Sequence, residues 1–328
     1  MNNPKVSIII LNWNGLKDTI GCLDSLKKIT YPNYDVIVVN NGSKGNDADV
    51  LEEKYKDYIK LIRNKENLGF TGGNNVGIDF VLKEKIAPDY IFLLNNDVKI
   101  QKNCLTNLVN AFLQTDAGII GAGTKDENRT DNKIYFGGHP MTKFSLIREF
   151  FPRAPLMLPE TDAILECNCV SGAAMLIKKE VLLDIYNSIG RYLNDKIFMY
   201  YDELDFCVAA RKLGHKSIIA QNAIIYHKGS SSTGGIYNPL AYYYSVRNYI
   251  ILSRNFFPFP IRHVIFIYNF IFNFIRAVKN TMHGRFYSSW AIFCGLYDGY
   301  TGTTGKWKYH DVISAKRRKE YLLNQKNL

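Results

Sequence analysis

Val6-Ser-Ile-Ile-Ile-Leu-Asn-Trp-Asn-Gly15 is a run of mostly branched apolar residues that ends abruptly in turn-forming residues. A short β-branched run of this kind predicts a buried strand, and the Asn and Gly residues at its end predict a turn. The residues that follow have a helical pattern, with Ile20, Leu23 and Leu26 on one face. This order, a buried strand and then an amphipathic helix, predicts a sheet with helices packed against it.

The same alternation continues through the first hundred residues. Helices are predicted at 47–57 and at about 76–85, and further strands at Tyr34–Val39, Ile59–Arg63 and Tyr90–Leu94. Strands and helices that alternate at this spacing predict an α/β fold, with a mixed, mainly parallel sheet and helices on both faces. Because ligands of such sheets bind beyond the carboxyl ends of the strands, the polar residues there are expected to share one crevice. They are Asn12, Asn14, Asn40, Asn41, Asn96 and Asp97.

The second half of the chain has a less regular pattern. Residues 122–165 are rich in Gly and Pro and predict a long irregular excursion. A late strand is predicted at Ser217–Tyr226, directly before His227. From about residue 240 the sequence becomes helical and aromatic, so we expect a domain of residues 1–239 and a helical C-terminal appendage of residues 240–328.

Several segments in order resemble family 2 glycosyltransferases of GT-A fold, the nucleotide-diphospho-sugar transferase fold, and especially bacterial rhamnosyltransferase-like members. They are the Val6–Gly15 segment, Val38-Val-Asn-Asn-Gly-Ser43, Asn67-Leu-Gly-Phe-Thr-Gly-Gly-Asn-Asn-Val-Gly77, Leu93-Leu-Asn-Asn-Asp-Val98, Val170-Ser-Gly-Ala-Ala-Met175 and Tyr200-Tyr-Asp-Glu-Leu-Asp-Phe-Cys207. The resemblance covers roughly residues 5–250. It implies a nucleotide-binding half at 1–98 and an acceptor-binding half at 99–239.

The resemblance implies a divalent metal, Mn²⁺ or Mg²⁺, at Asp97. That residue stands where the family carries the last acid of its Asp-x-Asp-like motif, and the other positions here are Asn95 and Asn96. A metal held by a carboxylate neutralises the charge that develops on a departing nucleoside diphosphate. His227 occupies the place of a third metal contact in some GT-A enzymes. A histidine that is only hydrogen-bonded at a strand end is an equal alternative.

Asp202-Glu203-x-Asp205 resembles the family's acidic base motif, usually Glu-Asp-x-Asp. An inverting transfer needs a carboxylate to accept the proton of the attacking hydroxyl, and the resemblance assigns this role to Glu203. Asp202 and Asp205 are then supporting acids, and whether Asp202 or Glu203 is the base stays open. Acids in a first helical turn are also favoured by the helix dipole alone.

The nucleotide-binding residues implied by the resemblance come from four segments. Asn12 and Asn14 are expected to line the base pocket, and Asn40 replaces an Asp that commonly contacts the nucleoside. The segment from Asn67 to Asn75 is predicted to be a loop under the nucleotide, whose glycines permit close backbone approach. With the strand-end residues, the predicted set is Asn12, Asn14, Asn40, Asn41, Asn67, Gly69, Gly73, Asn74, Asn96 and Asp97.

The positive charge of the chain is concentrated at its C-terminal end. Of a net charge of +11, residues 1–239 contribute almost nothing, with 28 Lys/Arg against 27 Asp/Glu, while residues 240–328 carry 13 against 3. Residues 256–278 are strongly apolar, with one polar stripe made by Arg262, Asn269, Asn273 and Arg276. Together with Lys316–Lys319, this pattern predicts a helix on an anionic membrane surface. A helix that packs within the protein is the alternative.

Other features of the sequence bound the compartment. The six cysteines are scattered without zinc-ligand spacing, which predicts reduced thiols. Met1–Lys5 leads directly into the first strand, so no signal peptide is expected. We therefore expect a cytoplasmic enzyme, peripheral on the inner face of the cell membrane.

The predicted reaction is the transfer of a sugar, with rhamnose as the first candidate, from a nucleotide-diphosphate donor to a glycan or lipid-linked acceptor in cell-surface glycan assembly. One alternative is a catalytically degenerate nucleotide-sugar-binding scaffold, because only one acid remains at residues 95–97. The other is a nucleic-acid-binding protein, which is less favoured because the basic tail belongs to no nucleic-acid module. The sequence is compatible with a monomer or a homo-oligomer.

Overall fold

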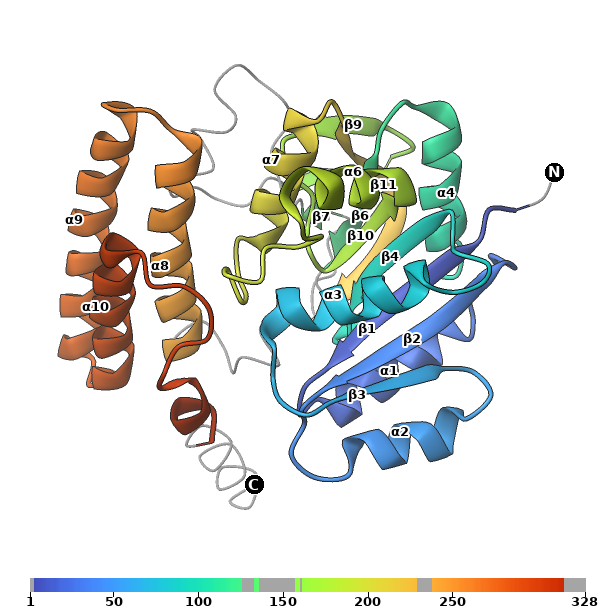
Figure 1. Cartoon of the computed structure of the whole chain (residues 1–328), viewed down its shortest axis with the longest axis horizontal. Coiled ribbons are helices and arrows are strands. Elements are labelled where there is room, and N and C mark those ends of the chain that lie inside the picture. The colour runs from blue at the N-terminus through green and yellow to red at the C-terminus, as the bar shows by residue number, and fades with distance from the viewer. Residues whose placement is uncertain (1–2, 126–132, 136–156, 160, 229–237, 316–328) are drawn as a thin grey trace. The chain divides into compact units, whose positions relative to one another are not determined.

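The computed structural model describes residues 3–125, 133–135, 157–159, 161–228 and 238–315 (Figure 1). The chain divides into two compact units. The sheet unit comprises Met1–Asn194 and Asp202–Ser232, and the helical unit comprises Asp195–Tyr201 and Thr233–Leu328. The short segment Asp195–Tyr201 thus belongs with the C-terminal helices, although the sequence pattern placed it in the first domain.

The sheet unit is built on one mixed sheet with the strand order β3-β2-β1-β4-β10-β6-β11-β5. Its first four strands are parallel, β10 runs antiparallel to β4 and β6, and β6 and β11 are parallel. The strands are β1 (Val6–Asn12), β2 (Tyr34–Asn41), β3 (Lys60–Asn64), β4 (Tyr90–Asn95), β5 (Val98–Ile100), β6 (Ile119–Lys125), β10 (Ala174–Lys178) and β11 (Ser217–His227), with β7 (Lys133–Tyr135), β8 (Met157–Pro159) and β9 (Ile164–Cys167) off this path. The predicted α/β fold is confirmed.

Helices cover both faces of the parallel strands because side chains alternate along each strand. Ile8 and Ile10 belong to the core that also contains Leu23 of α1, whereas Ile9 lies against α3 on the other face. All three isoleucines are fully buried. The helices of this unit are α1 (Leu16–Leu26), α2 (Asp47–Tyr55), α3 (Gly69–Leu82), α4 (Cys104–Gln114), α6 (Lys179–Ile189) and α7 (Asp202–Lys212).

The prediction of a glycine-rich loop before α3 is wrong, because the helix begins at Gly69 rather than near residue 76. Gly73 and Gly77 instead lie one helical turn apart on the face that meets the sheet. A Cβ at Gly73 would stand 2.4 Å from Leu11 Cδ1, and one at Gly77 would stand 2.6 Å from Ile9 Cγ2. These glycines therefore serve the close packing of helix on strand.

The predicted irregular region also differs from the structure. Residues 122–165 contain the end of β6 and the three short strands β7, β8 and β9. The remainder of the predicted excursion, including residues 136–156, lies outside the described residues, as does Lys316–Lys319.

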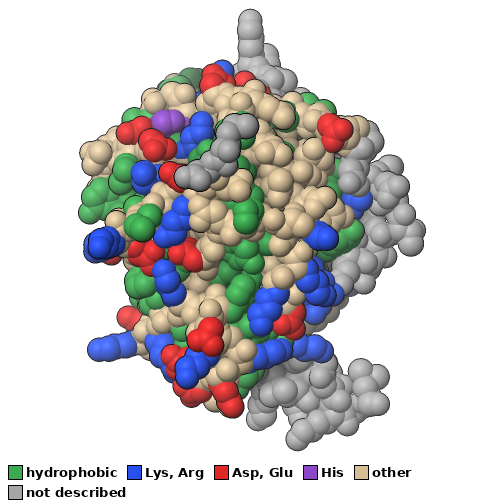
Figure 2. Space-filling model, turned by 90° about the vertical axis from the view of Figure 1, so that its right-hand side faces the viewer, with side chains coloured by type: hydrophobic (Ala, Val, Ile, Leu, Met, Phe, Trp, Pro, Cys, Tyr) green, Lys and Arg blue, Asp and Glu red, His purple; other side chains and the backbone are tan. Residues whose placement is uncertain are grey.

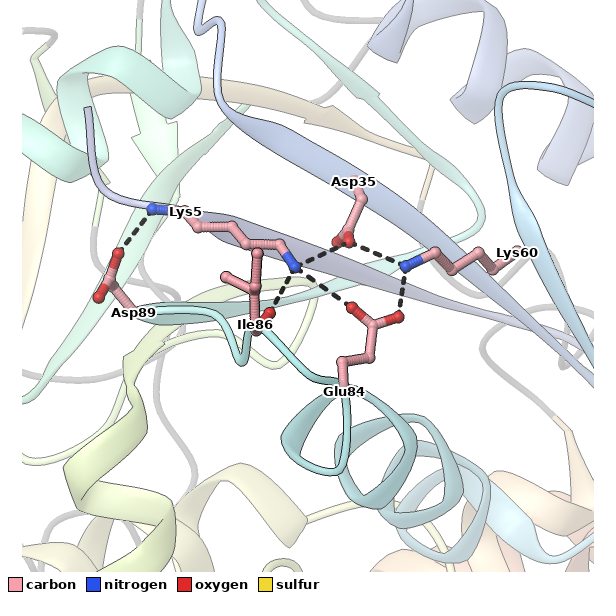
Figure 3. Close-up of polar contacts among 6 residues, drawn as sticks. All are labelled: Lys5, Asp35, Lys60, Glu84, Ile86 and Asp89. Atoms are coloured by element: carbon pink, nitrogen blue, oxygen red, sulfur yellow. Dashed lines mark hydrogen bonds and ion pairs between the residues drawn. The ribbon is translucent and has the colours of Figure 1, made fainter. Parts of the chain in front are cut away.

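A charged cluster joins the starts of β1, β2 and β3 to the end of α3 (Figure 3). Lys5 Nζ lies 3.4 Å from Asp35 Oδ2 and 3.2 Å from Glu84 Oε2, and it donates to the Ile86 carbonyl. Lys60 contacts the same two carboxylates. On the face shown in Figure 2, positively and negatively charged side chains are interspersed. This mixture agrees with the nearly equal numbers of basic and acidic residues in 1–239.

The helical unit contains α8 (Pro239–Phe256), α9 (Ile261–Met282) and α10 (Phe286–Thr301). Among the described residues, α9 alone is long and apolar enough to cross a membrane by length and composition, and only 22% of its most apolar window is buried. The predicted polar stripe is turned inward: Asn269 and Asn273 are buried, while Ile271 and Ile275 are more than half exposed. The periodicity predicted the stripe but not the side of the helix that packs on the protein.

Candidate active site

The polar ends of the first parallel strands meet at one edge of the sheet, as predicted. The register pairs Asn12 with Asn40 on β1 and β2, and Leu11 with Asn95 on β1 and β4. Asn12 Nδ2 donates to Asn40 Oδ1 at 2.9 Å. Asn12, Asn40 and Asn95 each follow a largely buried apolar run, which fixes where the amide side chains emerge.

Asn12 is the centre of a buried hydrogen-bond network. Its Nδ2 lies within 3.1 Å of acceptors on Asn40, Ser43 and Asp47, and its Oδ1 accepts from Thr19 Oγ1 at 2.8 Å. Asn96 Nδ2 donates to the same Thr19 oxygen at 3.0 Å. Sequence reasoning missed Thr19 and Asp47, since each stood inside a predicted helix with no signal beyond its polarity.

Asn14 links the turns that follow the first two strands. It adopts a left-handed backbone conformation with φ of 52°. Its backbone N–H donates to Ser43 Oγ at 2.9 Å, and its Oδ1 accepts from the Lys44 N–H at 2.8 Å. Asn tolerates this conformation better than most residues, which explains why an Asn suits the position.

Asn41 holds the chain at the start of α3. Its Nδ2 donates to Asn67 Oδ1 at 3.1 Å and to the Gly69 carbonyl at 3.0 Å, and Asn67 Oδ1 also accepts from the Gly69 N–H. Asn74 is buried and donates to the Phe70 carbonyl within the helix. Gly73 packs on Leu11. These predicted nucleotide-binding residues therefore hold the start of α3 against the end of β2, and we call this junction the β2–α3 corner.

The two predicted metal ligands lie side by side. His227 Nε2 is 3.1 Å from Asp97 Oδ1, and the Asp97 side chain is only 5% exposed. Asp97 follows β4, and His227 ends β11 opposite Val98, where the strands pair antiparallel. The pairing of β11 with β5 thus brings together two residues that are 130 positions apart, which sequence spacing alone does not reveal.

A carboxylate and an imidazole are suitable donors for Mn²⁺, and a carboxylate suits Mg²⁺. Among the residues that the structure describes, no group of three or more His, Cys, Asp or Glu side chains is arranged to hold an ion. Burial, and secondly the Asp97 charge, raise the pKa of the Cys22 thiol. The pair therefore fits a metal whose remaining ligands come from a diphosphate and water.

The acidic motif forms the first turn of α7, where the helix dipole favours carboxylates. Asp202 is buried and Glu203 is partly exposed. A Cβ at Gly172 would lie 3.7 Å from Glu203 Oε2 and 4.0 Å from Asp202 Oδ2. The loop before β10 thus lies close to both acids.

The same loop connects the acids to the end of β4. The Asn95 N–H donates to the carbonyl of Ala173, the residue after Gly172, at 2.9 Å. Asp97 lies two residues beyond Asn95, so the metal-binding candidate and the base candidate belong to one neighbourhood. This is the arrangement on which an enzymatic interpretation depends.

Asp205 is held in a different environment from the other two acids. Burial raises its pKa, although a hydrogen bond from Asn194 and the charge of Arg191 oppose the shift. A carboxyl with a raised pKa beside a second acid is a recurrent feature of catalytic sites, and it also occurs in structural networks.

A mixed sheet of this order, with polar strand ends, a carboxylate after β4 and an acidic helix nearby, defines a GT-A fold of the nucleotide-diphospho-sugar transferase class. The chain belongs to glycosyltransferase family 2: the model of "Glycosyl transferase family 2" matches residues 7–182. An uncharacterized glycosyltransferase of Haemophilus influenzae is 38% identical over 240 residues, which cover 72% of this chain and 69% of that protein.

Two further relatives support the family and the fold. The low-salt glycan biosynthesis hexosyltransferase Agl10 of Haloferax volcanii is 28% identical over 63% of this chain, and the match spans only 62% of that relative's length. The mannosyltransferase PcManGT of Pyrobaculum calidifontis, solved with GDP-Man and Mn²⁺, matches 92% of this chain and 88% of its own with a TM-score of 0.56 and 10% identity. That likeness shows the fold alone.

Proposed function

We propose that this chain is a metal-dependent hexosyltransferase that moves a sugar from a nucleotide-diphosphate sugar to a hydroxyl acceptor with inversion. The acceptor oxygen attacks the anomeric carbon, its proton passes to the Glu203 carboxylate, and the bond from that carbon to the diphosphate oxygen breaks. Asp202 and Asp205 set the position and charge of Glu203. The observation that carries the proposal is the loop at Gly172 and Ala173, which lies close to Glu203 and accepts a hydrogen bond from Asn95, two residues before Asp97.

Asp97 and His227 would hold Mn²⁺ or Mg²⁺, which neutralises the charge of the departing nucleoside diphosphate. The nucleotide is proposed to contact Asn14, Asn40 and the β2–α3 corner that Asn41 holds. Asn12 is fully buried and acts through Asn40 and Ser43. In this proposal residues 1–98 bind the donor, residues 99–239 bind the acceptor, and 240–328 form the appendage.

Replacing the proposed base tests the function. Full-length protein is incubated with UDP-, dTDP- and GDP-sugars, including dTDP-rhamnose, with Mn²⁺, and release of nucleoside diphosphate is measured. Glu203→Gln should lower kcat by about 100-fold or more. Glu180→Gln is the matched control, because Glu180 also lies in the first turn of a helix of the sheet unit. Equal turnover by wild type and Glu203→Gln would remove Glu203 as the base, and absence of turnover by the wild type with every donor would favour a non-catalytic scaffold.

The proposed setting is glycan assembly on a lipid-linked acceptor, and the Haloferax relative, a glycan biosynthesis hexosyltransferase, supports this class of pathway. We also propose that α9 and α10 bind the inner face of an anionic membrane. Small and polar residues of α9, including Asn273 and Ala277, face the protein, whereas Ile267, Ile271 and Ile275 are 53–62% exposed. Polar residues inside and apolar residues outside suit helices in contact with lipid. The surplus of basic residues after residue 240 adds attraction to anionic headgroups.

Flotation with vesicles of phosphatidylcholine and phosphatidylglycerol tests this surface. Ile271→Asp/Ile275→Asp should abolish flotation, and Ile86→Asp, at a 71% exposed position of the sheet unit, should not. A wild-type chain that fails to float, and whose solution dimer is broken by the double substitution, would show that a second copy covers this face.

A further inference from the structure

The backbone that leads into the acidic helix is unusual. Phe198, Tyr200 and Tyr201 have φ values of 68°, 67° and 64°. These are left-handed conformations that cost free energy for any residue with a Cβ and are rarest for bulky side chains. Asn14 is the other non-glycine residue with a positive φ in the described part of the chain. Such strain persists only where surrounding groups fix it.

Asn248, on α8, provides three of the contacts that fix this segment. Its Nδ2 lies 3.0 Å from the Ile197 carbonyl, 2.8 Å from the Met199 carbonyl and 2.9 Å from the Tyr200 carbonyl. Asn248 is fully buried. One amide group therefore binds the turn of chain that contains the first two left-handed residues.

Arg247 supports the same segment from the neighbouring position. Its Nη2 donates to the Ile197 carbonyl at 2.8 Å, its Nη1 donates to the Gly305 carbonyl, and its Nε donates to Asn248 Oδ1 at 2.9 Å. The Gly305 N–H in turn donates to the Lys196 carbonyl at 2.8 Å. Arg247 is also fully buried, so its planar set of donors is used on backbone carbonyls.

Aromatic contacts hold the side chains of the same segment. Phe198 stacks on Tyr244 with ring centroids 5.2 Å apart, and Tyr201 meets the ring of Tyr249 edge-on at 6.3 Å. Both partners belong to α8, as do Arg247 and Asn248. A single helix thus fixes the backbone carbonyls and the rings of residues 197–201.

We infer that Arg247 and Asn248 are positioning residues for the carboxylates of Asp202 and Glu203. The chain passes from Tyr201 directly into the first residue of α7, so the backbone angles at 200 and 201 determine where that helix begins. Neither side chain is exposed to a ligand; both act through the backbone. The inference rests on the proposed function for its catalytic consequence, and on the contacts of α8 for its structural part.

The structural part is tested by hydrogen–deuterium exchange on the intact chain. Asn248→Ala removes the amide group that contacts the three carbonyls, and Arg247→Lys removes the planar fork of donors while keeping the charge. Arg254→Ala is the control, because Arg254 lies on the same helix and binds the Gly299 and Tyr300 carbonyls instead. Exchange in peptides covering 196–205 should rise by about tenfold or more in both variants and stay unchanged in the control.

The catalytic part is tested with the donor that the nucleotide-sugar panel identifies. Misplacement of a reacting group lowers kcat strongly, so Asn248→Ala should lose about tenfold or more in kcat, with the donor KM within about twofold. The acidic limb of its pH profile should also shift, which general destabilisation would not cause. If exchange at 202–205 and kcat both stay at wild-type values in Arg247→Lys and Asn248→Ala, the inference is wrong.

The two proposals fail in different ways. Turnover that survives Glu203→Gln removes the proposed base but leaves the exchange result at 196–205 intact. If Asn248→Ala unfolds the helical unit, the exchange rates and kcat of Arg247→Lys test the positioning role instead. Faster exchange throughout α8 and α10 with unchanged kcat in that variant contradicts a positioning role.

Discussion

The two ends of the parallel strands in the sheet unit differ in how their charges are satisfied. At the amino ends, Lys5, Asp35, Lys60 and Glu84 form a cluster in which each cation contacts two carboxylates (Figure 3). At the carboxyl ends, the carboxylates of Asp47 and Asp97 contact an amide and an imidazole. The first end neutralises itself and contributes to stability. The second places these two carboxylates and the His227 imidazole where a donor diphosphate and its metal are proposed to bind.

The largest effect that would test this difference between the two ends of the strands is a loss of transfer activity on substitution of Asp97. Asp97→Asn keeps the side-chain shape but removes the charge, so Mn²⁺-stimulated transfer should fall by about 100-fold, as for loss of a group that stabilises developing charge. Titration of activity against Mn²⁺ measures it. Asp116→Asn, at a side chain 75% exposed and paired with Lys216, should leave the titration unchanged. A wild-type Mn²⁺ response in Asp97→Asn would remove the metal from this position.

The next effect concerns the buried amide network. Asn12→Ala leaves groups on Asn40, Asp47 and Thr19 without their shared partner, so the free energy of unfolding should fall by about 2 kcal/mol or more. Urea denaturation measures this loss. Asn33→Ala removes only an exposed hydrogen bond to the Asn3 carbonyl and should cost well under half as much. Equal losses in the two variants would mean that the network at the carboxyl ends contributes little.

The residues at the carboxyl ends of the strands also show how much of the site could be predicted from the sequence. The strand ends at Asn12, Asn40 and Asn96 followed from buried apolar runs, because such runs define the length of a strand and therefore where its last residue emerges. The closeness of Asp97 and His227 rested on the family resemblance, since a strand pairing across 130 residues leaves no local pattern. The structure at Gly73 was misjudged because a glycine that packs on a strand and one that opens a loop have the same local sequence.

Contacts between distant segments account for the other differences. The partners of Arg247 and Asn248 lie about fifty residues earlier, in Asp195–Tyr201, and no local pattern in the sequence links the two segments. Asn269 and Asn273 formed a visible stripe on a predicted helix. Periodicity gives the position of a stripe around the helix axis, and only the packing of α9 on α8 and α10 reveals that this stripe faces inward.

A smaller effect, dependent on pH, is expected at Asp205. Burial raises its pKa above the ordinary value for an aspartate, so the folded state binds a proton more readily than the unfolded chain. The stability that this carboxyl contributes is therefore present at pH values below the pKa of the unfolded chain and is lost as pH rises through the folded pKa. Asp205→Asn should raise the melting temperature at pH 7 relative to wild type, and the difference should shrink towards pH 4. A gain that stays constant across this range would contradict the raised pKa.

The smallest effect is expected at the charged cluster, where Lys60→Met removes one of two cations. Lys60 is 45% exposed, and its carboxylate partners keep Lys5, so the free energy of unfolding should fall by less than about 1 kcal/mol. Lys5→Met should cost more, because Lys5 is 21% exposed and also binds the Ile86 carbonyl. Both losses should diminish in about 1 M salt, where exposed charges are screened, and transfer activity should be unchanged. If Lys60→Met lowered kcat as much as Asp97→Asn, the charges at the two ends of the strands would not have separate roles, and the division between a self-neutralised end and a catalytic end would fail.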